Sequence, residues 1–202
     1  MQTAPGCKLT FQPLAGTPGL RIWDGFLPAQ EADALLAHLQ RALPWVQPEV
    51  HLYGKLRQIP RLQSWHGDSS AHYRYSGLPM APAPWTTALA RLRDQIQQVV
   101  GHPFNSVLAN LYRDGRDSMG WHADNEPELG QAPWIASFSL GARRDFALRQ
   151  AGSTRTALLL PLHHNQLLLM PPAMQQCWQH ALPRRLRVHQ ARINLTFRYI
   201  QP

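Results

Sequence analysis

The chain has 202 residues, 44% of them hydrophobic, which is enough to bury the core of one domain without disulfides or a structural metal. Twenty Lys and Arg residues face 12 Asp and Glu residues, and the net charge of +8 favours a polyanionic partner such as nucleic acid. No apolar stretch is long enough to span a bilayer, and no basic amphipathic helix suited to a membrane surface is visible.

The cysteines and the first residues bear on location. Cys7 and Cys177 form no C-x-x-C pair and no zinc-like cluster, so we expect two free thiols in a reducing compartment. Residues 1–20 lack the basic start and the apolar run of a signal peptide. We therefore expect the protein in the cytoplasm, or in the nucleus of a eukaryotic cell. We also expect it to be a monomer.

Two amphipathic helices are predicted in the first half of the chain. Over residues 29–43 the apolar residues recur at the spacing of one helix face, and Pro44 ends the run. The same spacing appears over residues 85–100, where Gly101 supplies a C-cap. We expect both helices to pack on a sheet and to carry no chemistry.

From Phe104 onward the pattern changes to short apolar or alternating runs, separated by turn residues. The runs span residues 104–113, 134–140, 145–149, 156–162, 165–171 and 192–200. Many short strands of this kind predict a sandwich, a barrel or a double-sheet jelly roll. With two helices ahead of the strands, we expect an α+β fold that forms a single domain over residues 1–202.

A first chemical motif, His122-x-Asp124, lies between these runs. At a strand end, residues i and i+2 project to the same side, so the imidazole and the carboxylate can reach one ion. His180 is the best candidate for a third ligand, with His163 and His164 as rivals. Two histidines and one carboxylate on one face of an octahedron leave three positions open, which suits a non-haem Fe(II) that binds a co-substrate and O2.

The last predicted strand alternates strictly between polar and apolar residues. Arg192, Asn194, Thr196 and Arg198 share one face, and the apolar residues share the other. A half-buried strand with its polar face in water would show the same pattern. Two arginines flanking Asn and Thr can instead hold a dicarboxylate, because a guanidinium binds a carboxylate through two parallel hydrogen bonds. Inside a barrel, the polar residues would line a pocket while the apolar face packs outside.

Together, these motifs closely resemble the AlkB family of Fe(II)- and 2-oxoglutarate-dependent dioxygenases. In chain order they are Asn110-x-Tyr112, His122-x-Asp124, His180 and Arg192-x-Asn194-x-Thr196-x-Arg198. Further segments resemble the branch of AlkB homologue two, which repairs duplex DNA: Gly54-Lys55, Pro60-Arg61, Tyr73-x-Tyr75-Ser76-Gly77 and residues 137–146. The resemblance implies a double-stranded β-helix (jelly-roll) core over about residues 104–202 and a nucleotide-recognition region over about residues 45–80.

The resemblance also implies the roles of individual residues at the centre of the site. His122, Asp124 and His180 would hold Fe(II). Arg192 and Tyr112 would bind the distal carboxylate of 2-oxoglutarate. Arg198 and Asn110 would orient the end of the co-substrate that binds the metal, with Asn194 and Thr196 in support.

The substrates implied by the resemblance are bases alkylated on ring nitrogens, such as 1-methyladenine and 3-methylcytosine, with etheno adducts as further candidates. These methylated bases carry positive charge, so their pocket should offer aromatic faces and a carboxylate. The candidate pocket residues are Tyr73, Tyr75, Ser76, Trp121, Asn125 and Glu126. The two tyrosines would also fit an ordinary strand.

Contact with the duplex is expected at two places. Tyr53 would be the wedge that fills the gap left by the extruded base, flanked by the substrate-binding residues Gly54, Lys55 and Arg61. A tyrosine that packs on a helix is the alternative for Tyr53. The second place is the basic run after His180, where the residues expected on the DNA backbone are Arg184, Arg185 and Arg187. Such a run is often just a solvated loop.

The sequence therefore predicts an enzyme that repairs N-alkylated bases in DNA with Fe(II), 2-oxoglutarate and O2, releasing succinate, CO2 and an aldehyde. One alternative is a dioxygenase of the same fold that acts on RNA, protein or a small molecule, because a fold does not determine a substrate. Another is a non-catalytic nucleic-acid-binding module with a vestigial site. The basic charge, together with the segments that resemble the duplex-repair branch, argues against the first alternative, and the full set of ligands and arginines argues against the second.

Overall fold

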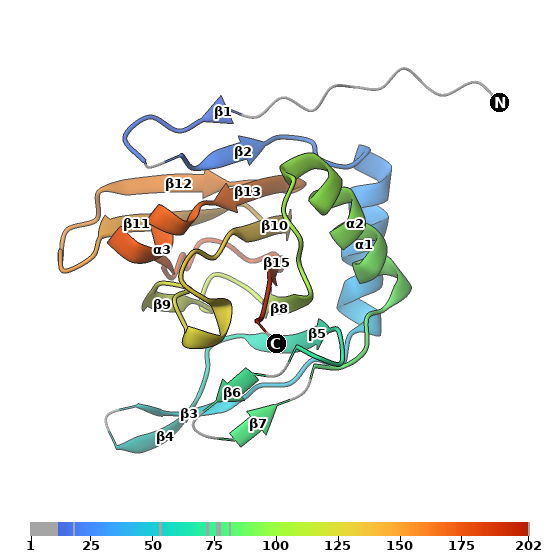
Figure 1. The fold of residues 1–202 in the computed structure, drawn as a ribbon, viewed down its shortest axis with the longest axis horizontal. Coiled ribbons are helices and arrows are strands. Elements are labelled where there is room, and N and C mark those ends of the chain that lie inside the picture. The colour runs from blue at the N-terminus through green and yellow to red at the C-terminus, as the bar shows by residue number, and fades with distance from the viewer. Residues whose placement is uncertain are drawn as a thin grey trace.

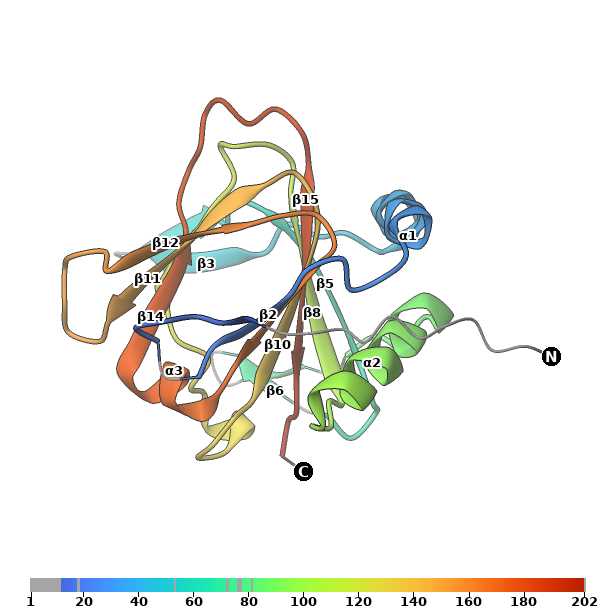
Figure 2. The same cartoon turned by 90° about the horizontal axis from the view of Figure 1, so that it is seen from above.

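Two antiparallel β-sheets pack face to face in the computed structural model, which describes residues 12–17, 19–52, 54–71, 73–75, 78–80 and 82–201 (Figures 1 and 2). The larger sheet runs β1 (Gln12–Pro13), β2 (Arg21–Trp23), β13 (Gln166–Met170), β10 (Ile135–Gly141), β15 (Arg192–Arg198), β8 (Ser106–Tyr112) and β5 (Leu62–Gly67). The smaller sheet runs β12 (Leu158–Leu162), β11 (Arg144–Gln150), β14 (Trp178–Leu182) and β9 (Met119–His122). This is the predicted double-stranded β-helix.

Two helices cover the outer face of the larger sheet, on the side away from the smaller sheet (Figure 2). They are α1 (Ala29–Ala42) and α2 (Thr87–Val100), close to the predicted bounds. The Thr86 side chain caps the start of α2 by accepting a hydrogen bond from the Leu89 N–H, and Gly101 ends it with φ +74°. Among the described residues, no helix is long and apolar enough to cross a membrane.

The core has two layers, and β15 separates them. Ile193, Leu195 and Phe197 are buried in the layer between the larger sheet and the helices. The second apolar layer lies between the sheets and includes Phe146, Leu148 and Leu168, among other residues. The opposite face of β15 carries its polar residues into a cavity between the same two sheets. The smaller sheet covers this polar face, so Arg192, Asn194 and Thr196 are buried. The polar residues of the predicted alternation therefore line a pocket and do not face water.

Two short hairpins extend from the side of the molecule where β5 lies (Figure 1). They are β3–β4 (Glu49–Leu52 and Lys55–Gln58) and β6–β7 (Tyr73–Tyr75 and Leu78–Met80). Gly54 turns the first hairpin with φ +72°, a backbone conformation that favours glycine. All four residues of β4 are exposed, so neither face of this strand is packed against the core.

The strand runs predicted from Phe104 onward all appear. The strand β14 was not predicted, and β9 was anticipated only as the strand end that carries His122. The sequence of β14, Trp178–Leu182, lacks a clear polar and apolar alternation, because the polar His180 is buried on one face and Gln179 on the other face accepts a hydrogen bond from Arg149. The short helix α3 (Pro172–Cys177) and the 3-10 turn η1 (Pro127–Leu129) were also not predicted. The turn η1 directly follows Glu126, and α3 directly precedes β14, the strand that carries His180.

Candidate metal and co-substrate site

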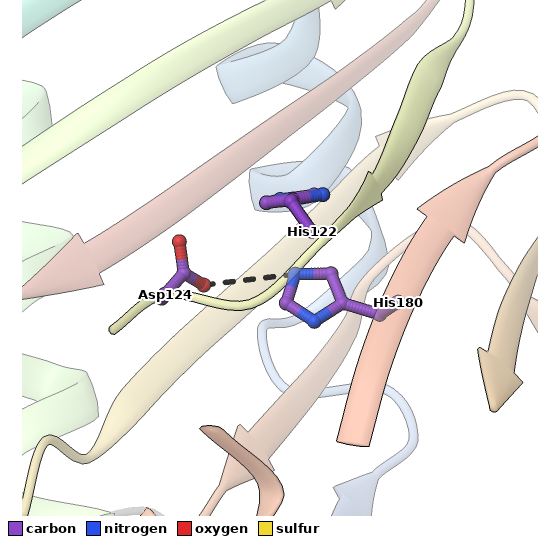
Figure 3. A group of neighbouring side chains, drawn as sticks. All are labelled: His122, Asp124 and His180. Carbon is purple, nitrogen blue, oxygen red and sulfur yellow. Dashed lines mark ion pairs between the residues drawn. The ribbon is translucent and has the colours of Figure 1, made fainter. Parts of the chain in front are cut away.

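Three potential metal ligands converge between β9 and β14 (Figure 3). His122 ends β9, Asp124 lies two residues later, and His180 is the central residue of β14. The pairing of β9 with β14 places His180 directly opposite His122. One potential ligand atom from each of the three residues lies within 4.8 Å of the other two. The structure thus brings together the three residues predicted as the metal triad.

Hydrogen bonds and stacking hold the two imidazoles. His122 Nδ1 lies 2.9 Å from the Gly120 carbonyl oxygen. Because a carbonyl only accepts, Nδ1 carries the proton in the neutral ring, and Nε2 remains as the ligand atom. The His180 ring stacks on Phe146 at 5.1 Å and meets the His122 ring edge-on at 4.1 Å. Groups that orient a metal-bound histidine in this way also tune its affinity for the ion.

The Asp124 carboxylate is oriented by three neighbours. Arg198 donates a short hydrogen bond to Oδ1, and Gln175 accepts the Asp124 backbone N–H at 3.0 Å. His180 Nε2 lies 3.6 Å from Oδ2. This second oxygen is buried and accepts no hydrogen bond, although buried carboxylate oxygens normally have donors. A metal ion bound at Oδ2 would satisfy it, so the residues present fit a divalent cation.

The protonation states suit metal binding. Burial alone would raise the pKa of Asp124, but Arg198 and the two histidines lower it to about 2. Burial and, to a smaller extent, the neighbouring His122 lower the pKa of His180 to about 3, although Asp124 opposes the shift. At neutral pH the carboxylate is therefore ionised and His180 is neutral, as metal ligands must be. The contact between them is not an ion pair under those conditions.

The rival histidines lie elsewhere. His164 Nδ1 accepts the Gly141 N–H at 2.9 Å, and its Nε2 lies 3.4 Å from an oxygen of Asp33. His163 is exposed in the turn between β12 and β13. Neither belongs to a group of potential metal ligands among the residues that the structure describes.

A cavity continues from the triad into the space between the sheets. At its buried end Arg192, the first residue of β15, donates from Nη2 to Ser139 Oγ and Asn194 Oδ1, both at 2.9 Å. Its Nε has no hydrogen-bond partner, and it forms no salt bridge within the described part of the chain. Burial lowers its pKa to about 10, so this arginine is still charged at neutral pH. A buried cation without a carboxylate fits an anionic ligand.

Hydrogen bonds along the cavity wall connect this arginine to the other predicted residues. Asn194 Nδ2 donates to Thr196 Oγ1 at 2.8 Å, and Ser137 Oγ donates to Asn194 Oδ1 at 2.9 Å. Tyr112 lies directly across the strand pair from Arg192, with its ring centroid 5.5 Å from the guanidinium carbon. These hydrogen bonds therefore fix the orientation of the polar side chains along the cavity wall, from its closed end to the metal triad.

Asn110 is oriented by two donors, one in the neighbouring strand β5 and one in the residue directly before that strand. Its Oδ1 accepts from Arg61 Nε at 2.9 Å and from Gln63 Nε2 at 3.0 Å. Both donors line the same cavity, so Arg61 belongs to the cavity wall and is only 8% exposed. The sequence had placed it with the substrate-binding residues around the hairpin.

Several residues that build this site were missed from the sequence. They are Gln63, Ser137, Ser139 and Gln175. For Ser137 and Ser139 a signal was present, because Ser-Phe-Ser alternates in a strand as the arginine strand does. Gln175 lies in α3, and no sequence spacing connects it with Asp124.

The predicted substrate residues are distributed over several places. Glu126 directly precedes η1, with Oε2 buried and without a hydrogen-bond partner, whereas Asn125 is exposed. Trp121 does not line the cavity: the Arg149 guanidinium carbon lies 4.3 Å from its ring centroid. The backbone of Tyr73 and Tyr75 forms β6, and Lys55 is exposed at the start of β4. The predicted residues Tyr53 and Ser76 lie outside the described residues.

The basic residues after β14 differ from one another. Arg184 and Arg187 are exposed. Arg185 instead has an internal partner, because its Nε lies 2.6 Å from Asp145 Oδ2. Exposed arginines are available to a phosphate backbone, whereas Arg185 would have to share its charge with Asp145.

Comparison with known proteins agrees with the oxygenase family that the sequence motifs resemble. The family model described as the 2OG-Fe(II) oxygenase superfamily matches residues 19–198. The chain is 38% identical to the human alpha-ketoglutarate-dependent dioxygenase alkB homolog 3 over 196 residues, which cover 93% of this chain and 68% of that protein. The bovine homolog 3 is 41% identical, and there the chain spans 65% of the relative's length.

A second group of relatives is equally similar. The mouse DNA oxidative demethylase ALKBH2 is 41% identical over 182 residues, which cover 85% of this chain and 76% of that protein. These identities do not separate homologue two from homologue three, so the resemblance to the first branch extends equally to the second. A solved structure described as the structure of OsALKBH1 superposes with a TM-score of 0.64 at 14% identity, covering 94% of this chain and 100% of that one. This likeness shows the shared fold.

Proposed function

This chain belongs to the 2-oxoglutarate–Fe(II) oxygenase superfamily and, within it, to the AlkB family, and we propose that it removes alkyl groups from the ring nitrogens of nucleic-acid bases by oxidation. Fe(II) is the cofactor, and 2-oxoglutarate and O2 are the co-substrates. The observation that carries the proposal is the single cavity that joins the His122–Asp124–His180 triad to the buried Arg192. Such a cavity suits a metal ion together with a dicarboxylate.

His122 Nε2, Asp124 Oδ2 and a His180 ring nitrogen would hold the iron, leaving the remaining positions for the co-substrates. When bound, the iron would supply the oxidising chemistry that converts the alkyl carbon to a hydroxyalkyl group, at the expense of 2-oxoglutarate and O2 and with release of succinate and CO2. The C–N bond of the hydroxylated group then breaks. Its electron pair stays on the ring nitrogen, the hydroxyl proton is lost to solvent, and the carbon leaves as an aldehyde. The residues of the cavity serve to bind, orient and exclude water.

The two arginines of β15 would bind opposite ends of 2-oxoglutarate. Arg192 and Tyr112 would bind the distal carboxylate at the closed end of the cavity, where the guanidinium is buried and lacks a carboxylate partner. Arg198 and Asn110 would orient the end near the metal, because Arg198 already contacts the ligand Asp124. The hydrogen bonds through Asn194, Thr196 and the two serines hold this wall in place before the co-substrate arrives.

The substrate would approach from the side of the two hairpins. Residues 45–80, which include both hairpins and β5, are proposed as the nucleotide-recognition region. Alkylation at N1 of adenine or N3 of cytosine makes the base cationic, and the buried, unpartnered Oε2 of Glu126 next to the metal motif suits a cationic base. Exposed Lys55, Arg57, Arg184 and Arg187 would contact phosphates. Relatives named as DNA oxidative demethylases favour DNA as the polymer.

The proposal is tested with defined oligonucleotides. Single-stranded and duplex oligonucleotides that carry 1-methyladenine, 3-methylcytosine or an etheno adduct are incubated with protein, Fe(II) and 2-oxoglutarate and analysed by mass spectrometry. Loss of the alkyl mass with one succinate formed per lesion is expected. The His180→Ala variant, which lacks one ligand of the triad, is expected to be inactive. Turnover of 2-oxoglutarate on RNA, a protein or a small molecule, with every DNA lesion left intact, would favour the alternative substrate classes.

A further inference from the structure

A second buried arginine lies close to the co-substrate cavity. Arg144, the first residue of β11, is 2% exposed. Its Nη1 donates to the Asp114 carbonyl at 3.0 Å, and its Nη2 donates to the carbonyls of Asp117 and Pro183, both at 2.8 Å. Its Nε has no partner, and no salt bridge joins it to an acidic residue in the described part of the chain. Carbonyl dipoles therefore solvate this cation only in part.

The three carbonyls belong to two loops that meet above Arg144. Residues 113–118 follow Tyr112 directly, and residues 183–191 connect β14 to β15. The loops share two backbone hydrogen bonds, Gly115 N–H to the Val188 carbonyl at 2.8 Å and Arg185 N–H to the Gly115 carbonyl at 2.7 Å. A Cβ on Gly115 would lie 1.7 Å from the Arg185 carbonyl oxygen, so only glycine allows this approach. Through these hydrogen bonds, Arg144 connects both loops to β11 of the smaller sheet.

The same arginine brings a second positive charge to Tyr112. The Arg144 guanidinium carbon lies 5.8 Å from the centroid of the Tyr112 ring, and that of Arg192 lies 5.5 Å from it. Burial lowers the pKa of Arg192 and the charge of Arg144 lowers it further, although Tyr112 opposes the shift. Two buried cations lie against one ring, and neither forms an ion pair with a carboxylate among the described residues. Asp114 and Asp117 offset part of the charge of Arg144, and the charge of Arg192 remains at this end of the cavity. An anion bound there would relieve it.

We propose that Arg144 is a positioning residue for 2-oxoglutarate, acting through Tyr112 and Arg192 without touching the co-substrate. This inference rests on the proposed placement of the distal carboxylate at Arg192 and Tyr112. Arg144 anchors the loop that begins at Tyr112 and so holds the ring against Arg192. It also supplies a second buried charge that favours the anionic end of the co-substrate. Its effect should therefore fall on 2-oxoglutarate binding and leave metal binding unchanged.

The test uses Mn(II), which fills the metal site without turnover. For each variant, Mn(II) affinity is measured first, from the electron paramagnetic resonance signal of the free ion. The affinity of the Mn(II)-loaded protein for 2-oxoglutarate is then measured by calorimetry. Arg144→Met should weaken 2-oxoglutarate roughly tenfold, the scale on which groups that orient a site from outside it act, with Mn(II) affinity unchanged. Arg144→Lys keeps the charge but loses the forked hydrogen bonds, so its loss should be smaller.

Arg143→Met is the matched control, because it removes the same charge one residue away, where the side chain is 60% exposed. It should leave both affinities unchanged. An unchanged 2-oxoglutarate affinity in Arg144→Met, or equal losses for Mn(II) and 2-oxoglutarate, would overturn the inference. Should Arg144→Met fail to fold, Arg144→Lys decides: a weaker 2-oxoglutarate affinity supports the inference, and an unchanged affinity overturns it.

Arg192→Met separates this inference from the proposed function. If that variant binds 2-oxoglutarate as tightly as the unchanged protein, the proposed co-substrate site is wrong, and Arg144 loses its role with it. If Arg192→Met binds weakly while Arg144→Met binds normally, the co-substrate site stands and only the role of Arg144 is overturned.

Discussion

Gln175 should control metal affinity although it touches no metal ligand atom. Asp124 lies beyond the end of β9, so the sheet does not hold its backbone. Its N–H donates to Gln175 Oε1 at 3.0 Å, and Asp124 and Gln175 are 1% and 2% exposed, so water is a poor substitute. Gln175→Leu keeps a similar volume but removes this acceptor. An unpaired buried N–H costs about 1–3 kcal/mol.

That cost should fall on metal binding. Without metal, the segment that carries Asp124 can shift to recover a partner for its N–H, whereas with metal bound the carboxylate must return to the triad. Since ~1.4 kcal/mol corresponds to a factor of ten in affinity, Gln175→Leu should weaken Mn(II) binding about tenfold. Gln175→Glu, which keeps an acceptor oxygen at the same reach, should bind Mn(II) at least as tightly as the unchanged protein.

The assay compares Mn(II) affinity with the melting temperature of the metal-free protein. Gln176→Leu is the control, because Gln176 is the next residue of α3 and makes only an exposed hydrogen bond, to the Gln131 carbonyl at 3.2 Å. That variant should keep its affinity. The reasoning is refuted if Gln175→Leu binds Mn(II) as tightly as Gln176→Leu does.

Four further outcomes are expected. Arg192→Lys should weaken 2-oxoglutarate in a titration of the Mn(II)-loaded protein, because an ammonium cannot form the paired hydrogen bonds of a guanidinium; an unchanged affinity removes Arg192 from the site. The pKa of His180 is lowered to about 3 in the folded protein, whereas the pKa of a histidine in the unfolded chain is about 6.5. The neutral ring therefore contributes its full stability above pH 6.5, and this contribution is lost as the pH falls toward 3. Thermal melts of the metal-free protein from pH 7 to pH 4 should therefore show a smaller loss of stability for His180→Gln than for the unchanged protein, and parallel curves would contradict this. Binding to undamaged DNA should weaken with salt, with a log–log slope of about −0.9 per phosphate neutralised, and Arg184→Ala should reduce the slope by about one such step; a flat salt dependence favours a protein or small-molecule substrate. For Tyr53, Tyr53→Ala should slow duplex repair about tenfold or more and single-strand repair much less, since stacking on a base contributes roughly 1–3 kcal/mol; an unchanged ratio of the two rates rules out a wedge.

The strand β15 shows what an alternating sequence pattern can predict and what it cannot. Alternation over residues 192–198 predicted one polar and one apolar face, and both are present. The pattern alone was equally consistent with a solvated face. Which reading holds depends on the smaller sheet that covers the polar face, and its strands come from distant parts of the chain. A local pattern contains no information about what will cover it.

The metal triad was predicted in part for the same reason. The spacing of His122 and Asp124 is local, so a strand end brings the two together wherever it lies in the fold. His180 had rivals in His163 and His164, and only the pairing of β14 with β9 sets it opposite His122. The family resemblance selected His180 because it compares whole chains, and so includes contacts that a single sequence does not display.

By itself, the sequence determined the elements whose signals are short in range: the two amphipathic helices, the alternating strands and the basic charge. Only the tertiary structure decided which buried groups meet. Gln175 reaches Asp124 across 51 residues, and Arg144 reaches Asp114 and Pro183 across 30 and 39 residues. The physical reason is that a hydrogen bond depends on distance and direction in space, and the closing of the two sheets sets both for residues far apart in the chain.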